Sequence, residues 1–212
     1  MSFLVAVCGG SCSGKSTLAA RILRLLGPAT ASLLAFDSYY LDQRTLTPLE
    51  RAEVNYDHPS SLDVELFSNH LGRLAAGKPI DCPVYDFATH TRLDETRRID
   101  PAPVVVVDGI LLLADDRLVP RFDMRIYRQC PEEVRLDRRI ERDVMYRGRT
   151  EDSVRKQFAT TVKPMHDQFV APSSQYADVV FQHEDIEVHD AAVIVVDRIR
   201  RELNWPAPTT GR

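Results

Sequence analysis

Residues 9–17 constrain the fold of this chain more than any other stretch, because they fit the phosphate-binding pattern G-x-x-x-x-G-K-[ST]. An unbroken apolar segment, residues 3–8, precedes them, and a helical segment, residues 18–26, follows them. A strand, a glycine loop and a helix are the context in which backbone N–H groups and the positive end of a helix hold a polyphosphate. In that context Lys15 reaches the β- and γ-phosphates, and the Ser16 hydroxyl ligates Mg²⁺. The alternative is an ordinary glycine turn. It would not explain why the lysine, the serine and both flanking segments also fit the pattern.

The composition excludes several classes of partner. The chain has 212 residues, of which 44% are hydrophobic and 27% charged, and its net charge of −4 gives no basic face for nucleic acid. No apolar run is long enough to span a bilayer, and we see no signal peptide. The four cysteines are scattered without the pairing of a zinc site, which favours reduced thiols and a cytoplasmic location. We therefore expect one domain over residues 1–205, a loose tail at 206–212, and neither a membrane nor a nucleic-acid partner.

Acidic residues follow two of the predicted strands. Five apolar runs predict the strands of one sheet: residues 3–8, 32–36, 103–108, 124–127 and 177–181. The second runs directly into Asp37, and the third ends in Asp108. In open α/β sheets functional groups collect beyond the carboxyl ends of the strands, so both carboxylates should lie on the edge that holds the phosphate loop. Asp108 then has the position of the acidic residue that lies near a nucleotide's magnesium. The alternative role of Asp37 is that of a helix cap or a turn residue.

Two segments outside the predicted sheet are rich in aromatic side chains. Residues 41–61 are polar and irregular and end in Asn55-Tyr56-Asp57-His58-Pro59, and so long a loop in a compact domain is usually functional or disordered. Residues 62–76 read as a helix with leucines on its core side. Residues 79–100 alternate Val84 and Asp86 with Tyr85 and Phe87, which predicts a hairpin-like excursion from the main sheet. His90 lies beside these rings and is either a ligand-binding or a surface residue.

Arginines form a stripe along the predicted helix at residues 132–146. At 100° per residue, Leu136, Ile140 and Val144 form an apolar stripe, and a second stripe lies beside it. The second stripe consists of Arg135, Arg139, Arg142 and Tyr146, and Arg147 and Arg149 follow it on either side of a glycine. We interpret these arginines and a lid at about residues 146–152 as a clamp over phosphates. The alternative is a solvated face paired with Glu132, Asp137 and Glu141. From Thr150 a further helix begins, which Pro164 ends or bends, and the last helix covers about residues 189–203.

The rest of the predicted site selects among the activities that share a phosphate loop. A regulatory GTPase needs a guanine-reading N-K-x-D, which the sequence lacks, and a motor or large ATPase needs a longer chain. An aspartate beyond the second strand, an aromatic-rich insertion and an arginine-rich helix suit a small-molecule kinase. That chemistry demands positioning, charge neutralisation and a base for the acceptor hydroxyl.

Motifs along residues 3–181 resemble those of the uridine–cytidine kinase family in order and spacing. They are Asp37-Ser38-Tyr39-Tyr40, Asn55-Tyr56-Asp57-His58-Pro59, Pro83-Val84-Tyr85-Asp86-Phe87, His90-Thr91-Arg92, Asp108-Gly109-Ile110-Leu111, Arg138-Arg139-Ile140-Glu141-Arg142-Asp143, Arg147-Gly148-Arg149 and Gln175-Tyr176-Ala177-Asp178. The resemblance implies transfer of the γ-phosphate of ATP or GTP, with Mg²⁺, to the 5′-hydroxyl of uridine or cytidine. It also implies an α/β fold: a three-layer P-loop NTPase domain with a five-stranded parallel sheet and a β-hairpin, about residues 79–100, over the acceptor site. Members usually form tetramers, so a homo-oligomer is expected.

The resemblance also implies a role for each matching residue. Asp37 would be the base at the 5′-hydroxyl, Lys15 would serve the transferred phosphate, and Arg142, Arg147 and Arg149 would bind the phosphates. The phosphate loop would be Gly9, Gly10, Ser11, Cys12, Ser13, Gly14, Lys15, Ser16 and Thr17, with Ser16 and Asp108 near the metal. Asp57 and Arg139 would hold the ribose hydroxyls. The nucleoside would be walled by Tyr40, Tyr56, Phe87 and Ile110, and its base would meet Tyr85, His90 and Gln157.

The sequence departs from the family pattern at three places. The family usually has Glu at the position of Asp108, Val-Asp at the position of Arg128-Gln129, and a Pro-Arg-Gly-Gly turn at residues 182–185. The departures bear on donor affinity and assembly more than on reaction type. Alternatives to a uridine–cytidine kinase are a relative such as a phosphoribulokinase or a nicotinamide riboside kinase, or a nucleotide-binding regulator that has lost turnover.

Overall fold

A five-stranded parallel sheet forms the centre of the molecule. The computed structural model describes residues 1–206, so all but the first residue of the tail expected at 206–212 lies outside the described residues. Within residues 1–206 the strands follow the order β2-β5-β1-β6-β7 with every neighbouring pair parallel. The strands are β1 (Phe3–Cys8), β2 (Ala31–Ala35), β5 (Val104–Asp108), β6 (Met124–Gln129) and β7 (Val179–Gln182). The predicted α/β class and five parallel strands are therefore confirmed, although β6 extends two residues further than expected.

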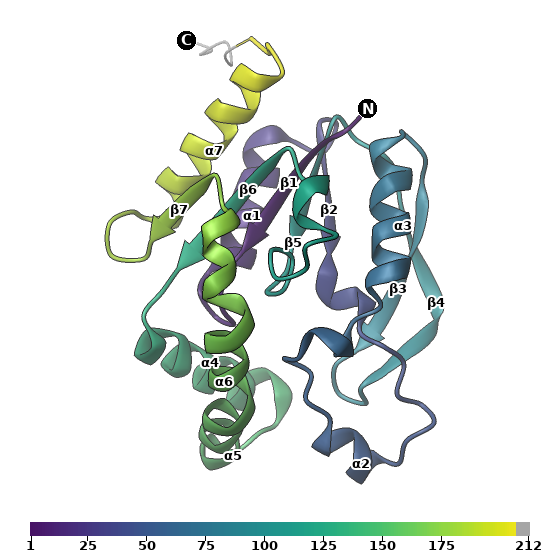
Figure 1. Ribbon diagram of the computed structural model, residues 1–212, viewed down its shortest axis with the longest axis vertical. Coiled ribbons are helices and arrows are strands. Elements are labelled where there is room, and N and C mark those ends of the chain that lie inside the picture. Colours follow the sequence, from purple (N-terminus) through teal and green to yellow (C-terminus); the bar gives the residue numbers. More distant parts are fainter. Residues whose placement is uncertain (207–212) are drawn as a thin grey trace.

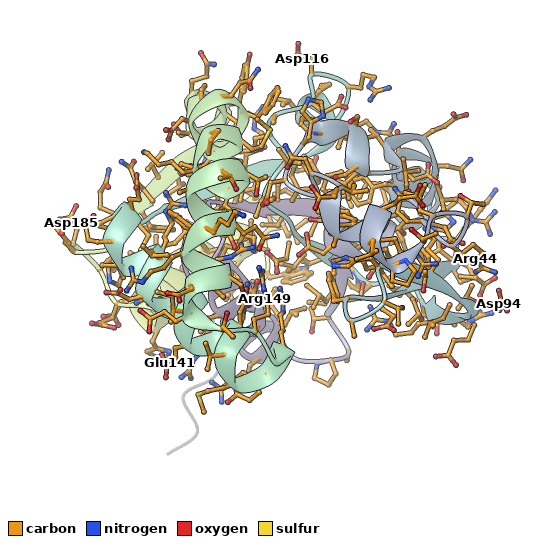
Figure 2. The ribbon with its side chains drawn as sticks, turned by 90° about the horizontal axis from the view of Figure 1, so that it is seen from below. Arg44, Asp94, Asp116, Glu141, Arg149 and Asp185 are labelled. Atoms are coloured by element: carbon orange, nitrogen blue, oxygen red, sulfur yellow. The ribbon has the colours of Figure 1, made fainter. Side chains whose placement is uncertain are left out.

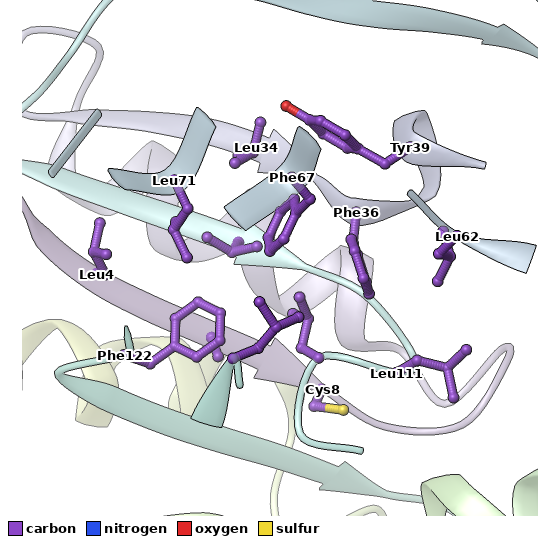
Figure 3. Close-up of a cluster of buried hydrophobic side chains, with 14 of the residues drawn as sticks. Leu4, Cys8, Leu34, Phe36, Tyr39, Leu62, Phe67, Leu71, Leu111 and Phe122 are labelled. Atoms are coloured by element: carbon purple, nitrogen blue, oxygen red, sulfur yellow. The ribbon is translucent and has the colours of Figure 1, made fainter. Parts of the chain in front are cut away.

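Both faces of the sheet are covered, because side chains alternate along each buried strand. Leu4, Ala6 and Cys8 of β1 belong to one apolar cluster, which Figure 3 shows with Phe36 and Phe67. The intervening Val5 and Val7 belong to a second cluster on the opposite face. Helices α1 (Lys15–Leu26) and α7 (Val188–Glu202) pack on this second face, and α3 (Val64–Ala75) packs on the first. The result is a three-layer α/β arrangement (Figure 1).

The remaining helical elements connect the strands, and several of them lie at the end of the molecule where the strands reach their carboxyl ends and the site is found. They are the 3₁₀ turns Phe36–Tyr39, Pro59–Ser61, Val119–Arg121 and Pro172–Tyr176, the helices α2 (Pro48–Glu53), α4 (Glu132–Arg147), α5 (Glu151–Gln157) and α6 (Lys163–Met165), and the π-helical turns Phe158–Val162 and His166–Val170. The segment at residues 41–61, expected to be irregular, contains α2, which begins with a Thr47–Glu50 capping box. In Figure 1, α4, α5 and α6 lie on one side of this end of the molecule, and α2 lies on the other.

Pro164 does not end the helix that begins after Thr150. The Thr150 hydroxyl caps the helix by accepting a hydrogen bond from the Ser153 N–H (3.3 Å), as expected. The helical backbone then continues through Pro164 to Val170, with a π turn before and a π turn after α6. Proline cannot donate the hydrogen bond of a regular α-helix, and wider turns accommodate that loss.

The hairpin consists of β3 (Ile80–Asp86) and β4 (Thr91–Ile99), which pair with each other and not with the main sheet. Arg92 of β4 fastens it to the segment after β2. Its guanidinium donates to the carbonyl oxygens of Tyr40 (2.8 Å) and Tyr39 (3.1 Å) and to the Asp63 carboxylate (3.1 Å). The hairpin is thereby held beside the chain that leaves the carboxyl end of β2.

Two of the departures from the family pattern contact each other. Arg128 is only 1% exposed, and it donates hydrogen bonds to the carbonyl oxygens of Gln182 (3.2 Å) and Ile186 (3.0 Å). A buried cation therefore ties together the turn that follows β7.

None of the helices in residues 1–206 combines the length and the apolar character that crossing a membrane requires.

Candidate active site

The phosphate loop leaves β1 through Gly9 and enters α1 at Gly14. Gly9 has φ +145°, and a Cβ there would lie 2.4 Å from the backbone oxygen of Arg128, so no other residue fits. Gly14 has φ +92° and is the N-cap of α1. The N-terminus of α1 therefore faces the interior of a tight loop, as phosphate binding requires.

Lys15 lies at the centre of a group of carboxylates supplied by different strand ends. Its ammonium is 3.7 Å from the Asp108 carboxylate and donates to the Ser16 hydroxyl at 3.4 Å. Burial raises the pKa of Asp37, Lys15 opposes that rise, and Asp108 and Asp57 add to it. The carboxyl ends of β2 and β5 thus bring Asp37 and Asp108 to the phosphate loop, where the sequence placed them.

The Asp108 carboxylate and the Ser16 hydroxyl fit a magnesium ion. Asp108 Oδ1 is buried, and no hydrogen-bond donor satisfies it in the described part of the chain. A hard divalent cation prefers oxygen ligands of this kind and usually retains several waters. The shorter aspartate, in place of the family's usual glutamate, still lies beside Lys15.

A cluster of aromatic side chains adjoins Asp37. The Tyr40 ring lies 5.2 Å from the Tyr85 ring and 5.9 Å from the Tyr56 ring, and Tyr85 is 5.2 Å from Phe87. The His90 ring stacks on Tyr56 at 4.2 Å and 11°. His90 adopts φ +56°, which is uncommon for a residue other than glycine, at the turn between the hairpin strands. Five rings from three segments of the sequence therefore meet in one place.

Polar atoms within this aromatic cluster lack protein partners. Within residues 1–206, neither His90 Nδ1 nor the Tyr85 hydroxyl has a hydrogen-bond partner, although both atoms are buried. Burial and the charge of Arg147 lower the pKa of His90, so its imidazole is neutral at pH 7. Buried polar groups without partners are costly, which makes them expected contacts of a ligand.

The arginines of α4 surround a buried aspartate. Asp143 is fully buried, and its carboxylate lies 2.8 Å from Arg142, 3.5 Å from Arg139 and Arg147, and 3.9 Å from Arg149. The sequence suggested either a phosphate clamp or a solvated face for α4, and neither interpretation identified Asp143 as the partner of the arginines. Four cations around one anion leave the cluster with an excess of positive charge, as polyphosphate binding requires.

The apolar stripe predicted on α4 does not form its buried face. Arg135 and Arg139 are buried at 2% and 7% exposure, whereas Val144 is 44% exposed. Leu136 and Ile140 are only half-buried. The hydrophobic pattern therefore predicted the wrong buried face for α4. The buried face carries arginines instead of apolar residues because it faces a polar site.

The segment predicted as a lid contacts both the arginine cluster and the hairpin. Arg139 donates to the Ser11 hydroxyl (2.9 Å) and to the Gln157 side-chain oxygen (3.0 Å), and Arg149 donates to the same oxygen. The Arg147 guanidinium lies 5.6 Å from the centre of the Phe87 ring. In Figure 2, Arg149 lies near the middle of the molecule, whereas the Arg44–Asp94 ion pair is at its rim.

Two further residues predicted to bind the acceptor, Asp57 and Ile110, lie where the phosphate loop meets the helical segment. Asp57 and Ile110 line a small cavity together with Ser11 and His166. Burial raises the pKa of Asp57, and Arg139 and Arg142 oppose that rise. Arg135 and His166 also reach the phosphate loop, at Gly10.

Sequence reasoning gave no role to Asp143, Arg92 or His166, and it placed Arg135 in the phosphate clamp without its contact at Gly10. A signal existed for the first: Asp143 lies four residues from both Arg139 and Arg147, a spacing that brings helical side chains together. Arg92 lay in a motif of the family resemblance, but its contacts are to Asp63 and to two backbone oxygens, which no sequence pattern reveals. The contacts of Arg135 and His166 depend on how the helices pack.

The chain matches proteins of known family along most of its length. The model of the phosphoribulokinase / uridine kinase family matches residues 4–188. A uridine kinase of Lactococcus lactis subsp. cremoris is 43% identical over 203 residues, covering 96% of this chain and 98% of its own. A uridine kinase of Streptococcus uberis is 42% identical over 177 residues, covering 84% of each chain.

Solved structures support the fold. A phosphoribulokinase from Rhodobacter spheroides has a TM-score of 0.64 at 15% identity, covering 85% of this chain and 70% of its own. A D-glycerate 3-kinase from Cryptococcus neoformans has a TM-score of 0.59 at 15% identity, covering 79% of each chain. With the phosphate loop, the paired aspartates and the family match over residues 4–188, this chain belongs to the phosphoribulokinase / uridine kinase family.

Proposed function

We propose that this protein is a uridine–cytidine kinase, which transfers the γ-phosphate of ATP or GTP to the 5′-hydroxyl of uridine or cytidine. The observation that carries the proposal is the aromatic cluster that includes His90 and adjoins Asp37. A group of flat aromatic rings with a few unpartnered polar atoms suits a nucleoside base, whereas a sugar phosphate needs charged groups instead. The names of relatives more than 40% identical agree with this assignment.

Asp37 is the proposed general base. It lies beside Lys15 and Asp108 at the phosphate loop and is in electrostatic contact with Arg147 of the lid. Its raised pKa makes the carboxylate a stronger base than an exposed aspartate. Lys15 and the arginine cluster neutralise the charge on the transferred phosphate, while the carboxylate accepts the proton of the 5′-hydroxyl.

Ser16 and Asp108 would hold the magnesium ion that kinases of this kind use. When bound, the ion neutralises charge on the donor phosphates and orients them. The protein's own part is to present the Asp108 carboxylate at the edge of the loop and to keep Lys15 beside it.

His90, Tyr85 and Gln157 are the proposed readers of the base. Neutral imidazole has one donor and one acceptor nitrogen, so His90 can serve the 4-carbonyl of uracil or the 4-amino group of cytosine. The Gln157 side-chain oxygen already accepts from two arginines, which leaves its NH₂ group for the substrate. Tyr85 and Phe87, whose ring centres lie 5.2 Å apart, are the proposed walls that leave room for a single ring, so purines should be excluded.

Residues 146–152 would act as a lid, since they connect the arginine cluster to the hairpin. The homo-oligomer that the family resemblance implies is part of the same proposal, and light scattering tests it independently of activity.

A panel of acceptors with labelled ATP and labelled GTP tests the function. Uridine and cytidine should be phosphorylated, and adenosine, ribulose 5-phosphate and nicotinamide riboside should not be. Turnover of ribulose 5-phosphate or nicotinamide riboside alone would reassign the substrate class. Tight ATP binding without any turnover would identify a nucleotide-binding regulator.

A further inference from the structure

The helical segment after the lid presents one buried face to the phosphate loop. Every fourth residue lies on this face: Val154, Phe158, Val162, His166 and Val170. The four apolar members are 0–3% exposed, and His166 is half-buried. His166 is therefore the one member of the stripe that can form hydrogen bonds through its side chain.

The two π turns explain how this stripe stays on one face. A spacing of four residues overshoots a 3.6-residue turn by about 40°, so four steps along a regular α-helix would displace the stripe by about 160°. π turns are wider and correct the drift, and they occur frequently at functional sites. The turns at Phe158–Val162 and His166–Val170 thus bring His166 to the side on which Phe158 is buried.

His166 meets the phosphate loop at Gly10, together with Arg135. A Cβ on Gly10 would lie 3.0 Å from His166 Nδ1 and 2.9 Å from Arg135 Nη1. Arg135 is 2% exposed, and its Nε donates to the Cys130 carbonyl oxygen at 3.2 Å. Its guanidinium lies 5.8 Å from the centre of the Phe158 ring. Two side chains from different helices therefore press against the same glycine of the loop.

Both side chains keep a polar atom available there. His166 Nδ1 and Arg135 Nη1 are buried, and in residues 1–206 neither atom has a hydrogen-bond partner. The cavity lined by His166 and Ser11 has room for about one water molecule. Arg135 is a nearly buried cation without a carboxylate partner, and it lies behind the phosphate-binding loop. Burying such a charge is costly, so an anion bound in the loop would stabilise it.

The charge of His166 is held at zero by its surroundings. Burial and the neighbouring Arg135 lower its pKa to about 4, and Lys163 contributes in the same direction. Asp167 and Glu132 act in the opposite direction, but both are engaged with Lys163. A neutral imidazole lies against Gly10 without adding a second positive charge beside Arg135.

We propose that His166, supported by Arg135, is a positioning residue that holds the Gly10–Ser11 part of the phosphate loop in its phosphate-binding conformation. It thereby sets the affinity for the triphosphate of the donor and leaves acceptor binding unaffected. The inference rests on the proposed function in one respect, that the loop binds a nucleoside triphosphate.

Equilibrium binding to His166→Ala tests the proposal without relying on turnover. Affinities for MgATP, inorganic tripolyphosphate and uridine are measured by calorimetry on the full chain. Loss of the support should weaken MgATP and tripolyphosphate binding about tenfold, with uridine binding within about twofold of wild type. Val154→Ala is the matched control, because it removes a buried side chain from the same stripe away from Gly10. It should lower the melting temperature with donor affinity unchanged.

A second pair of variants keeps the test decisive if His166→Ala is unstable. Gly10→Ala places a methyl group against His166 and Arg135, so it should weaken donor binding. The weakening should be smaller in His166→Gln, where a flexible side chain that suits a helix replaces the imidazole, and this coupling measures the contact directly. Unchanged donor affinity in His166→Ala, equal weakening of donor and uridine, or additive effects of the two variants would each overturn the proposal. Normal tripolyphosphate binding by a wild-type protein that phosphorylates no nucleoside would instead refute the proposed function.

Discussion

Asp143 is the residue on which the arrangement of the arginine cluster depends. Its carboxylate is fully buried among four guanidinium groups, so removing its charge leaves these cations repelling one another. Breaking a buried ionic group by removing one partner typically costs 3–5 kcal/mol. Asp143→Asn should therefore lower the free energy of unfolding by about 3 kcal/mol, measured by urea denaturation. Glu141→Gln on the exposed side of α4 should change it by less than about 0.5 kcal/mol. Equal effects of the two variants on the free energy of unfolding would show that Asp143 does not stabilise the arginine cluster.

Asp37→Asn should lose turnover and gain stability. Removing a general base commonly lowers kcat by about 10² or more, while nucleoside binding survives. Burial raises the pKa of Asp37 in the folded protein, so folding favours the protonated form. That stability is present below the unfolded pKa and is lost as pH rises through the folded pKa. The neutral amide of Asn does not ionise, so the variant does not lose this stability as the pH rises. The melting temperature of Asp37→Asn should therefore exceed that of wild type at pH 7, and by a smaller margin at pH 4. Near-normal uridine phosphorylation would remove Asp37 from the base role.

His90 should decide between the two pyrimidines. Phenylalanine fills the place of the imidazole on Tyr56 but offers neither a donor nor an acceptor. The substrate that depends more on the lost hydrogen bond then suffers a penalty of about 1–3 kcal/mol, roughly ten- to a hundredfold in relative efficiency. The ratio of kcat/KM for uridine over cytidine is compared in wild type and His90→Phe. An unchanged ratio would mean that another residue reads the base.

At the scale of elements, Arg128 replaces a feature of the family with a different kind of contact. It joins β6 to the turn after β7 through two carbonyl oxygens, and hydrogen bonds to charged groups contribute about 1.5–3 kcal/mol. Arg128→Met should lower the free energy of unfolding by about that amount and accelerate hydrogen exchange at residues 182–186. Arg125→Met, on the same strand, removes only a partly exposed ion pair with Asp178 and should cost less than about 1 kcal/mol. Slow exchange at residues 182–186 in Arg128→Met would show that the turn is held by other contacts.

The elements that the sequence predicted best are those with a local signal. The buried strands read as apolar runs, and the phosphate loop has glycines at positions where the backbone leaves the region open to other residues. α4 was misread because its inner face carries arginines, and hydrophobic periodicity cannot distinguish a polar site from solvent. The course of the helix through Pro164 depends on π turns, which have no sequence signature of their own. The contact of His166 with Gly10 forms only when that helix packs on the phosphate loop, and local sequence patterns do not predict such packing.

At the scale of the whole molecule, the charge of the site differs from that of the chain. The chain carries a net charge of −4, yet cations converge on the phosphate loop: Lys15, Arg135, Arg139, Arg142, Arg147 and Arg149. An anionic ligand relieves the repulsion within this group, so ligand binding and folding stability are linked. The lysine supplies the charge inside the loop, and the arginines supply it from α4 and the lid.

Inorganic tripolyphosphate should therefore stabilise the protein in the absence of any nucleoside. A ligand present at a hundred times its dissociation constant adds about 2.7 kcal/mol to the free energy of unfolding. For a chain of this length each kcal/mol raises the melting temperature by about 2–4 °C, so the expected increase is roughly 5–10 °C. Sodium chloride at equal ionic strength is the control for general screening, and it should give no comparable increase because it does not fit the loop. Lys15→Ala should abolish most of the increase, since this lysine supplies the positive charge inside the loop, 3.7 Å from Asp108. An equal increase in wild type and Lys15→Ala would place the anion on the exposed surface and separate the arginine cluster from the phosphate loop.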